Sequence, residues 1–537
     1  MMGSRIHPAA RLAIVAACLV ATAASAASAQ TITRGPYLQS VSPTSITFRW
    51  RTNVATASRV DLGGAPGNYT LSVTDPVLTT EHEVRVTGLQ PGTNYPYAVG
   101  LPAALLTPPD ATYRCTTAPP SGASAPVRVW VVGDSGENGT DAQTVRNRFE
   151  SFSATRPPDL WLMLGDNAYS SGSESDYQTG CFNLYPAELR KWPLFPTRGN
   201  HDGLFSGANN DYLEFFTLPS LGELGGVPSG SESYYSYDWG NVHFICLDSE
   251  GSDRTLGGPM IMWLRQDLAA TNAAWVVCYW HHPPYTKGSH DSDDASDSGG
   301  RMRDMRQNVI PILDSTGVDL VLSGHSHSYE RSYLLNGHYG LSTTLTAAMK
   351  VGPGDGRVGG NGPYTKAHIE QHPFEGAVYT VAGSSSKSDG VSSMPCMVSS
   401  ISTLGSLVLD FNGHRLDARF LDATGSVRDS FAIVKGGGLV NAPPPGRTLA
   451  LAPARPTPAR GEVALDFTLA AAGPATLDVF DATGRRLARL VDGVLEAGPH
   501  HAVWRGAAHD RAAPPGAYWA MLTAGGELRV QRVVLTP

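Results

Sequence analysis

The chain has 537 residues, which is too long for one hydrophobic core and therefore predicts several domains. Charged residues make up 16% of the sequence, whereas glycine (58) and proline (39) are abundant, a composition typical of a strand-rich protein with many loops. The formal net charge is −8 and no basic stripe occurs, which argues against a nucleic-acid partner because nothing would neutralise its phosphates.

Residues 1–29 are predicted to be a cleavable secretory signal. Arg5 and Arg11 precede the apolar run "LAIVAACLVATAASA", and its small residues at 27–29 predict cleavage before Gln30. No other stretch reaches about 18 uninterrupted apolar residues, so we expect no transmembrane segment. These features predict a secreted or cell-surface protein.

Residues 31–118 are predicted to form a small β-sandwich. Runs such as "SITFRWRT" and "HEVRVTGL" alternate apolar and polar residues, and turn residues separate them. The stretch "GLQPGTNYPYAV" (88–99), together with Trp50 on an earlier strand, resembles a fibronectin type III module. A linker rich in proline, serine and glycine (116–126) closes this module.

Residues 125–435 show a different pattern, typical of an α/β layered domain. The apolar runs "VRVWVV", "LWLML", "VHFICL", "WVVCYW" and "VDLVL" are continuous, as expected for strands covered on both faces. Helical patterns such as "GPMIMWLRQDLAAT" and "RMRDMRQNVIPILDSTG" separate several of them.

A proline-rich linker (441–461) leads to a last module, residues 462–537. Runs such as "EVALDFTL" and "AYWAMLTA" alternate again, which predicts a second small all-β sandwich. The sequence "VFDATGRRLARLVDG" with "PPGAYWAMLTAGG" resembles the Ig-like C-terminal modules that serve as sorting signals for type IX secretion. It is equally similar to the Ig-like domain of flagellar hook-capping proteins. The resemblance implies export or surface display, with type IX secretion machinery as a partner.

The cysteines do not predict a complete disulfide framework. Cys18 lies in the signal, where "VAAC" could be a lipoprotein motif, but apolar sequence continues well past it. The five others are an odd number. Cys246 and Cys278 lie in apolar strand-like runs and are expected to be buried thiols. Cys181 and Cys396 are expected in polar loops, where they could pair.

Polar side chains follow five of the strands predicted for the central domain, most of them directly after a glycine that permits a sharp turn. Ligands of open α/β sheets bind at the carboxyl ends of the strands. The residues at these ends are Asp134, then Asp166 and Tyr169, then Asn200, His201 and Asp202, then His281 and His282, and finally His325 and His327.

Each motif alone carries little weight. An aspartate after a strand is more often a helix cap or a turn residue, and a histidine is more often a buried structural side chain. Five such ends in one domain, each bearing Asp, Asn or His, make those structural explanations poor ones for the set.

The motifs G-D-x-G, G-D-x-x-Y, G-N-H-D, H-x-P-x-Y and G-H-x-H-x-Y-E-R resemble those of purple acid phosphatases within the calcineurin-like metallophosphoesterases. The resemblance covers about 310 residues and the module before them. It implies a metallophosphoesterase layered sandwich as the central fold. It also implies that Fe(III) is bound by Asp134, Asp166, Tyr169 and His327, and that Asp166 bridges to a divalent ion (Zn, Mn or Fe) held by Asn200, His281 and His325.

The chemistry of these side chains agrees with that assignment. A bridging carboxylate can hold two cations at the roughly 3.5–4 Å separation of two-metal hydrolases. Phenolate is a hard, strongly donating anion, so Tyr169 beside two aspartates favours ferric iron. A neutral amide oxygen and two imidazoles suit a softer divalent metal.

Two further histidines are candidates for contact with a substrate phosphate. His201 follows Asn200, and the resemblance implies that it contacts the phosphate. His290 lies nine residues after His281, where plant-type members carry a histidine that faces the substrate; as His⁺, either could neutralise the phosphate or protonate the leaving oxygen. The alternative for His290 is a solvated loop residue, because the acidic run 291–297 follows it.

The remaining polar residues of these motifs are expected to have structural roles. His282 is favoured as packing behind the site over an extra metal ligand. Glu330 and Arg331 are expected to orient their loop. Asp202 stands where plant-type enzymes usually have Glu, which could alter the surroundings of the ligands. The acidic run 291–297 lacks the spaced glycine of a calcium loop and is expected to be solvated.

The sequence therefore predicts a secreted acid phosphatase that hydrolyses phosphate monoesters by attack of a metal-activated hydroxide. One alternative is a phosphodiesterase or nucleotidase on the same core, since loops 170–240 and 286–300 would choose the substrate. Another is a surface adhesion protein with an inactive core, which the complete set of ligand residues disfavours. The substrate is expected to be a small phosphorylated molecule.

Overall fold

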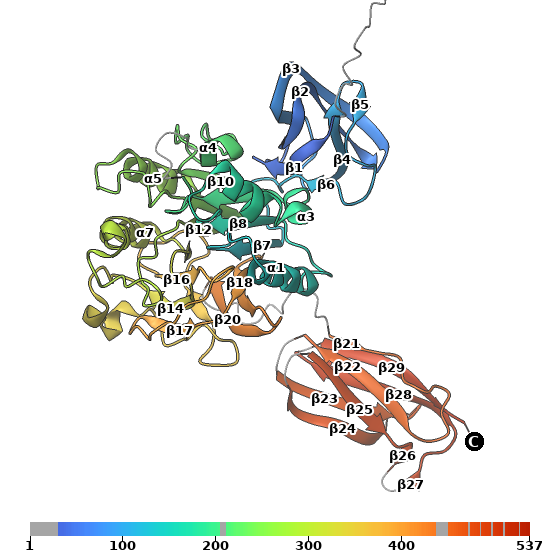
Figure 1. Cartoon of the computed structure of the whole chain (residues 1–537). Coiled ribbons are helices and arrows are strands. Elements are labelled where there is room, and N and C mark those ends of the chain that lie inside the picture. The colour runs from blue at the N-terminus through green and yellow to red at the C-terminus, as the bar shows by residue number, and fades with distance from the viewer. Residues whose placement is uncertain are drawn as a thin grey trace, which may run out of the picture.

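A computed structural model describes residues 30–203, 211–436, 449–470, 473–483, 485–495, 498–508, 511–525 and 527–536. The predicted signal (1–29) and residues 437–448, which include the start of the proline-rich linker, lie outside these ranges. Figure 1 shows a strand-rich N-terminal module, a larger central domain and a strand-rich C-terminal module. Within the described part of the chain no helix is long and apolar enough to cross a membrane.

The N-terminal module is a six-stranded sheet built around one long strand. Strand β2 pairs with three neighbours, so one strand links almost the whole module. The strands are β1 (Ile32–Gln39), β2 (Ser45–Ala65), β3 (Asn68–Thr87), β4 (Asn94–Leu101), β5 (Ala104–Leu105) and β6 (Arg114–Thr116). The alternating apolar runs predicted parts of β2, β3 and β4, and Trp50 lies in the core.

The central domain consists of two seven-stranded sheets. The first has the order β10 (Tyr235–Trp239), β11 (Val242–Cys246), β12 (Trp275–Tyr279), β13 (Leu320–Ser323), β16 (Ala377–Ala382), β14 (Tyr329–Leu335) and β17 (Met397–Ile401). The second has the order β15 (Tyr364–Lys366), β20 (Val427–Lys435), β19 (Arg415–Asp422), β18 (Gly405–Asn412), β7 (Val127–Val132), β8 (Leu160–Leu164) and β9 (Leu194–Thr197).

Parallel strands lie side by side in each sheet and carry the predicted apolar runs. Strands β11, β12, β13 and β16 are parallel in the first sheet, and β7, β8 and β9 in the second. Their side chains are almost all fully buried, as the unbroken apolar runs predicted. The antiparallel strands β18, β19 and β20 extend the second sheet and were not predicted as a group.

Helices accompany the sheets, and the two predicted helical patterns, residues 258–271 and 301–317, are helical over most of their length. The main ones are α1 (Thr140–Phe152), α5 (Pro259–Ala270) and α7 (Ile310–Thr316). Helix α7 ends a longer helical stretch that begins with α6 (Arg301–Asp304) and a π-helical turn, η3 (Met305–Val309). Helices α5 and α7 pack with strands of the first sheet into one cluster of buried apolar side chains. Shorter elements are α2 (Glu174–Tyr177), η1 (Gln178–Phe182), α3 (Pro186–Leu189), α4 (Asp211–Phe215), η2 (Asp297–Gly300), η4 (Ser342–Thr344) and η5 (Ala347–Met349).

The N-terminal module is fastened to the segment that follows the second predicted metal-binding motif. The guanidinium of Arg34 lies 4.6 Å from the ring centroid of Phe182 and 4.4 Å from that of Phe215, and its Nε donates to Gln178 Oε1 at 3.0 Å. The Tyr37 hydroxyl donates to the carbonyl oxygen of Phe215 at 2.8 Å. The module thus helps to fix the chain between residues 174 and 217.

The C-terminal module has two sheets that share one cluster of buried side chains. One sheet contains β21 (Ala450–Leu451), β22 (Val463–Leu469) and β25 (Gly498–Trp504); the other contains β24 (Arg486–Leu495), β23 (Gly473–Phe480), β28 (Gly516–Ala524) and β29 (Glu527–Leu535). A short hairpin, β26 (Ala507–Ala508) and β27 (Arg511–Ala512), completes it.

All five cysteines within the described ranges are buried free thiols. The expectation for Cys246 and Cys278 is confirmed. The expectation for Cys181 and Cys396 is wrong, because Cys181 lies in the π-helical turn η1 and Cys396 packs into an apolar cluster beside β17. Packing by apolar side chains buries both thiols, and neither forms a disulfide bond.

Candidate metal centre

Asp134, Asp166 and His325, at the carboxyl ends of β7, β8 and β13, all have left-handed backbone conformations. Their φ angles are 53°, 51° and 69°. Non-glycine residues adopt this conformation at a cost, and such strain gathers at functional sites. Two glycines allow the strand ends to approach closely: a Cβ on Gly165 would lie 2.4 Å from His281 Nδ1, and one on Gly324 would lie 2.5 Å from Asp134 Oδ2. A larger residue at either position would push ligand groups apart.

One side of the site joins two carboxylates, a phenol and an imidazole. The Tyr169 hydroxyl donates to Asp166 Oδ2 at 2.9 Å and lies 3.3 Å from Asp134 Oδ1. The Nε2 of His327 lies 3.7 Å from the same Asp134 oxygen. On its other side, His327 Nδ1 donates to Asp389 Oδ2 at 2.6 Å, which leaves Nε2 as the acceptor that faces the carboxylate. Asp134 thus lies close to both Tyr169 and His327, and Tyr169 also contacts Asp166.

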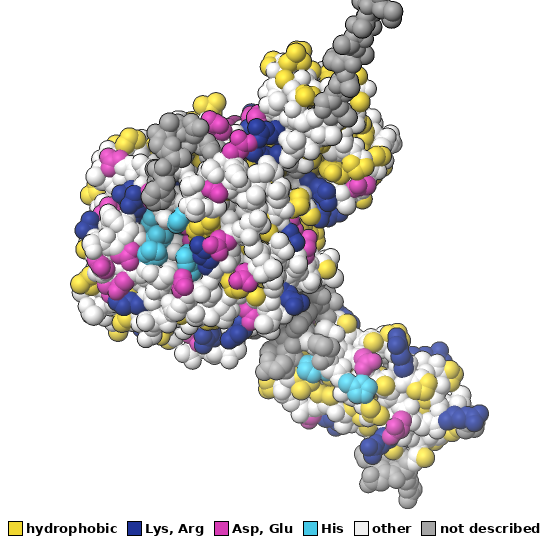
Figure 2. Space-filling view, viewed as in Figure 1, with side chains coloured by type: hydrophobic (Ala, Val, Ile, Leu, Met, Phe, Trp, Pro, Cys, Tyr) yellow, Lys and Arg dark blue, Asp and Glu magenta, His cyan; other side chains and the backbone are white. Residues whose placement is uncertain are grey.

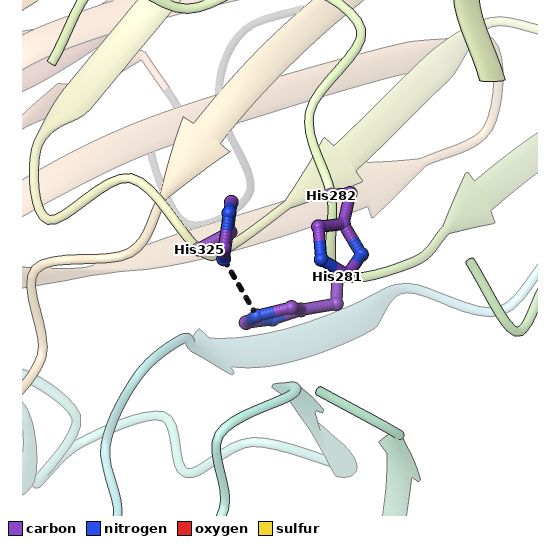
Figure 3. Close-up of side chains that lie close together, drawn as sticks. All are labelled: His281, His282 and His325. Atoms are coloured by element: carbon purple, nitrogen blue, oxygen red, sulfur yellow. Dashed lines mark hydrogen bonds between the residues drawn. The ribbon is translucent and has the colours of Figure 1, made fainter. Parts of the chain in front are cut away.

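The other side of the site joins two imidazoles and an amide. His281 Nε2 lies 3.0 Å from Asn200 Oδ1 and 3.5 Å from Asp166 Oδ1. His325 Nδ1 approaches the same His281 nitrogen at 3.1 Å (Figure 3). Because His281 Nδ1 donates to the Leu164 carbonyl oxygen at 2.9 Å, its Nε2 is an acceptor. Asp166 belongs to both sides and connects them.

The electrostatics of this cluster call for a cation. Burial, together with the neighbouring charge of Asp166, raises the pKa of Asp134 well above its usual range. Burial lowers the pKa of His281 and of His325. The carboxylates and neutral imidazoles direct their lone pairs toward one another, and few N–H or O–H groups lie among them. Bound cations would satisfy these lone pairs, so this set of side chains fits metal ions. Two groups with suitably close ligand atoms are Asp134, Asp166 and His281, and His281, His282 and His325.

His282 packs behind the candidate ligands. Its Nδ1 lies 2.9 Å from Ser249 Oγ and its Nε2 lies 3.4 Å from Glu250 Oε2. Its ring centroid is 4.4 Å from that of His325, and Figure 3 shows it beside the facing pair His281 and His325. This is the packing position that the sequence favoured, although its closeness to two candidate ligands leaves it within reach of a metal.

Asp202 and Asn167 hold the loops together. Asp202 is fully buried and accepts from the backbone N–H groups of Asn167 (2.9 Å) and Gly199 (2.8 Å) and from the Tyr177 hydroxyl (2.7 Å). The Asn167 amide donates to Thr197 O at 2.8 Å. Asp202 therefore ties the loop of Asp166 to the loop of Asn200, as expected of a residue that supports the ligands.

His201 lies at the edge of the site. Its backbone N–H donates to Asp166 Oδ1 at 2.8 Å, and its Nδ1 donates to the Ser170 carbonyl oxygen at 2.6 Å. The ring centroid lies 4.7 Å from that of Tyr169. The imidazole thus borders the carboxylate and tyrosine side of the cluster.

His290 lies against the other side. Its ring stacks on His325 with centroids 3.8 Å apart and planes 17° apart, and its Nδ1 donates to Asp297 Oδ1 at 2.9 Å. The acidic run that argued for a solvated loop therefore supplies the carboxylate that orients this histidine. The run is also less solvated than expected, because Asp293 accepts from the Ser342 backbone N–H at 2.9 Å.

An open pocket of about 430 Å³ lies over this side of the cluster. Its lining comprises Asn200, Glu250, His282, His290, Ser298, Arg301 and His325. Arg301 pairs with Glu250, Nε to Oε2 at 2.8 Å. Figure 2 shows histidine side chains gathered with acidic and basic ones on this face of the central domain.

Sequence reasoning missed several side chains that touch the site. They are Glu250, Ser298 and Arg301 in the pocket, Asp389 behind His327, and Lys387, whose Nζ lies 3.9 Å from the ring centroid of Tyr169 and 2.8 Å from Glu137 Oε1. None of them belongs to a strand-end motif, so no spacing signal could have found them. Arg331, in contrast, forms the expected structural pair with Asp429 at 2.6 Å.

Two family models match the chain. Residues 127–329 match the calcineurin-like phosphoesterases, and residues 34–117 match the purple acid phosphatase N-terminal domain. Residues 127–329 are therefore similar to a calcineurin-like phosphoesterase domain, and residues 34–117 to the N-terminal domain of purple acid phosphatases. Several of the curated relatives are named purple acid phosphatases.

Purple acid phosphatase 15 of Arabidopsis thaliana is 28% identical over 305 residues, which cover 51% of this chain and 54% of the relative. Purple acid phosphatase 23 of Arabidopsis thaliana is 28% identical over 320 residues, which cover 54% and 65%. The chain thus spans between about half and two thirds of the length of these relatives.

Solved structures agree on the fold. A purple acid phosphatase from yellow lupin (Lupinus luteus) seeds matches with a TM-score of 0.58 at 17% identity, covering 75% of each chain. The structure of PhoD matches with a TM-score of 0.53 at 16% identity, covering 75% of this chain and 90% of the other.

Proposed function

We propose that this protein is an exported phosphatase that hydrolyses phosphate monoesters at a binuclear metal centre. The observation that supports the proposal is that six side chains from five strand ends lie near Asp166. On one side lie Asp134, Tyr169 and His327; on the other lie Asn200, His281 and His325. When bound, Fe(III) with a divalent Zn, Mn or Fe ion would supply Lewis-acid polarisation of the phosphoryl oxygens and activation of water.

The chain's own residues account for binding and orientation. Asp166 would serve both metal ions, and the His281 Nδ1–H bond to the Leu164 carbonyl oxygen leaves Nε2 as a lone-pair donor that would bind the divalent ion. Tyr169, a phenol between two aspartates, favours ferric iron at the first. His201 and His290 border the two sides of the cluster, where each could donate a hydrogen bond to a phosphate oxygen or a proton to the leaving oxygen.

The test combines metal analysis with a panel of phosphomonoesters and phosphodiesters. We expect about one iron and one divalent ion per chain, a visible tyrosinate-to-Fe(III) band that disappears in Tyr169→Phe, and faster turnover of monoesters at acidic pH. A colourless, fully metallated protein that is active with two zinc ions would contradict the ferric assignment. Preference for diesters would favour a phosphodiesterase or nucleotidase, and no turnover with both metals bound would favour an adhesion protein.

We also propose that residues 1–29 direct export and that residues 462–537 act as a sorting module for type IX secretion. The C-terminal module supports this separation of roles because it has a buried core of its own. A chain of residues 30–440 should keep phosphatase turnover and change only where the protein accumulates. Loss of turnover in that chain, soluble and folded, would contradict the proposal.

A further inference from the structure

The loop between β15 and β16 contains a second group of metal-ligating side chains, which belongs to no strand-end motif. Two histidines and a glutamate follow one another with the spacing H-x₃-H-x₂-E: His368, His372 and Glu375. One ligand atom from each lies within 4.8 Å of the others. All three come from a single segment of eight residues, whereas the centre described above takes its residues from five strand ends.

This loop lies at the edge of the sheet opposite the metal centre. Strand β16 runs parallel to β13, with Leu320 beside Val378 and Ser323 beside Val381. His325 follows the carboxyl end of β13, whereas the loop precedes the amino end of β16. The length of the strands therefore separates the two groups, and they cannot share a metal ion.

Within the loop, the carboxylate of Glu375 is less exposed than the imidazoles of His368 and His372. His368 Nδ1 donates to Glu375 Oε1 at 2.6 Å, and His372 Nδ1 lies 3.9 Å from the same oxygen. The imidazole rings stack with centroids 3.6 Å apart and planes 4° apart. The side chain of Glu375 is 13% exposed, and those of His368 and His372 are 52% and 46% exposed. An ion could thus reach the group from solvent.

The backbone holds these donors in place. A Cβ on Gly317, directly after helix α7, would lie 2.5 Å from the backbone N of His372, so the loop packs closely on the end of that helix. The Phe374 N–H donates to the Asp314 carbonyl oxygen at 2.7 Å. The His368 N–H donates to Glu375 Oε2 at 3.3 Å. A site held in this way loses little entropy when it binds an ion.

We propose that His368, His372 and Glu375 bind a zinc ion. Two imidazoles and one carboxylate form a donor set that zinc prefers, with a position left for water, whereas magnesium and calcium prefer oxygen ligands alone. Tetrahedral zinc with bonds of about 2.0–2.1 Å needs its ligands near one another, and one ligand atom of each of these residues lies within 4.8 Å of the others. The loop leaves β15 of one seven-stranded sheet and enters β16 of the other. Bound zinc therefore stabilises the connection between the two sheets.

The experiment uses the full chain with its metal centre already loaded, and titrates zinc by calorimetry and metal counting. The wild type should bind about one further zinc ion per chain and unfold at a higher temperature with zinc present. Glu375→Gln and His368→Ala/His372→Ala should weaken this binding by more than about 100-fold and remove the thermal shift, because loss of a ligand costs at least as much as loss of a supporting residue.

Glu370→Gln is the matched control, since it removes the same charge from an exposed residue of the same loop. It should bind zinc as the wild type does, and phosphatase turnover should be equal in all these variants. The proposal is overturned if the His368→Ala/His372→Ala chain keeps the extra zinc and its thermal shift, or if Glu370→Gln loses them. Should the double variant misfold, His372→Ala alone decides in the same way.

Discussion

Two buried groups of histidines and carboxylates lie in or beside the same seven-stranded sheet. They differ in whether protein hydrogen bonds satisfy their charged and polar atoms. In the first, His243 of β11 lies between two aspartates: Nδ1 is 2.7 Å from Asp238 Oδ1 and Nε2 is 2.9 Å from Asp267 Oδ2. Burial alone would lower the pKa of His243, but these hydrogen bonds outweigh it and raise the pKa to about 9. The imidazolium is charged at neutral pH, and both of its N–H donors have protein partners.

The second group is the candidate metal centre, where acceptors face one another. His281 uses its Nδ1–H on a backbone carbonyl, so its Nε2 presents a lone pair to Asn200 Oδ1 and His325 Nδ1. Burial raises the pKa of Asp134 and lowers the pKa of His281. Histidine and aspartate occur in both groups, so composition alone does not mark a metal site. A surplus of converging acceptors over donors does.

The largest expected effect comes from removing the bridging charge. Asp166→Asn should release both metal ions and lower phosphatase turnover by at least about 10³-fold, because the cations lose the carboxylate they share. The metal-free variant should be no less stable than the metal-free wild type, since one of two crowded carboxylates is gone. Metal analysis, turnover and thermal unfolding measure these outcomes.

Asp267→Asn is the matched change in the first group. It should leave metal content and turnover unaltered and destabilise the protein, because a buried imidazolium loses a partner. If Asp166→Asn kept two ions and normal turnover, the distinction between the two groups would be wrong.

His201→Ala should lower kcat/KM by about 10²–10³-fold while both metals remain bound. The imidazole borders the cluster and its contacts to Asp166 come from the backbone, so the substitution leaves the metal-binding atoms in place. Steady-state kinetics and metal analysis of one preparation separate the two effects. An empty metal centre in this variant would show instead that His201 is a ligand.

The group of His243, Asp238 and Asp267 predicts a loss of folding stability at alkaline pH. Because the folded pKa of His243 is about 9 and the ordinary value is 6.5, its contribution is complete below pH 6.5 and disappears as the pH rises through 9. The difference corresponds to about 3 kcal/mol. Urea unfolding between pH 6 and 10 measures it, and His243→Gln should flatten this part of the profile.

His82→Gln is the control for that experiment. Burial lowers the pKa of His82 to about 4, so this histidine is neutral in the folded protein throughout the range. The unfolded chain has also lost this proton above about pH 7.5, so in that part of the profile the replacement should not change the slope. An unchanged slope in His243→Gln would contradict the assigned charge.

The smallest expected effect is spectroscopic. Lys387 places its ammonium 3.9 Å from the ring centroid of Tyr169, where it lowers the energy of the ring electrons. Lys387→Met should therefore move the tyrosinate-to-Fe(III) band to longer wavelength with little loss of turnover. Lys350→Met is the matched control, because Lys350 lies 3.7 Å from the Tyr333 ring away from the centre. If the band lay at the same wavelength in Lys387→Met and Lys350→Met, the ammonium of Lys387 would have no effect on Tyr169.

The sequence predicted the parts of this molecule that depend on short-range pattern. Unbroken apolar runs located β7, β8, β11 and β12 because strands buried on both faces leave no polar positions. Asp, Asn or His at five strand ends, directly after a glycine at four of them, identified residues that the structure brings together. Both signals are local in the sequence. The parallel strands bring their carboxyl ends to one edge of the sheet, where these residues form one site.

What the sequence did not reveal depends on contacts between distant segments. Arg301 reaches Glu250 across 51 positions, and Lys387 reaches Glu137 across a still longer separation, so no motif links them. The misplaced Cys181 and Cys396 failed for a related reason. Polar neighbours in sequence suggested loops at the surface, whereas packing from other elements covers both thiols.

The five buried thiols have a consequence for how opening motions can be followed. A thiolate reacts with alkylating reagents and a buried thiol does not, and burial raises the pKa of Cys115 and of Cys181. The native chain should be almost inert to such reagents, so each labelling event reports a local opening. Cys115 lies in the N-terminal module and Cys181 lies in the helical turn that contacts Arg34. Their relative rates of labelling would show whether that module detaches by itself or opens together with the central domain.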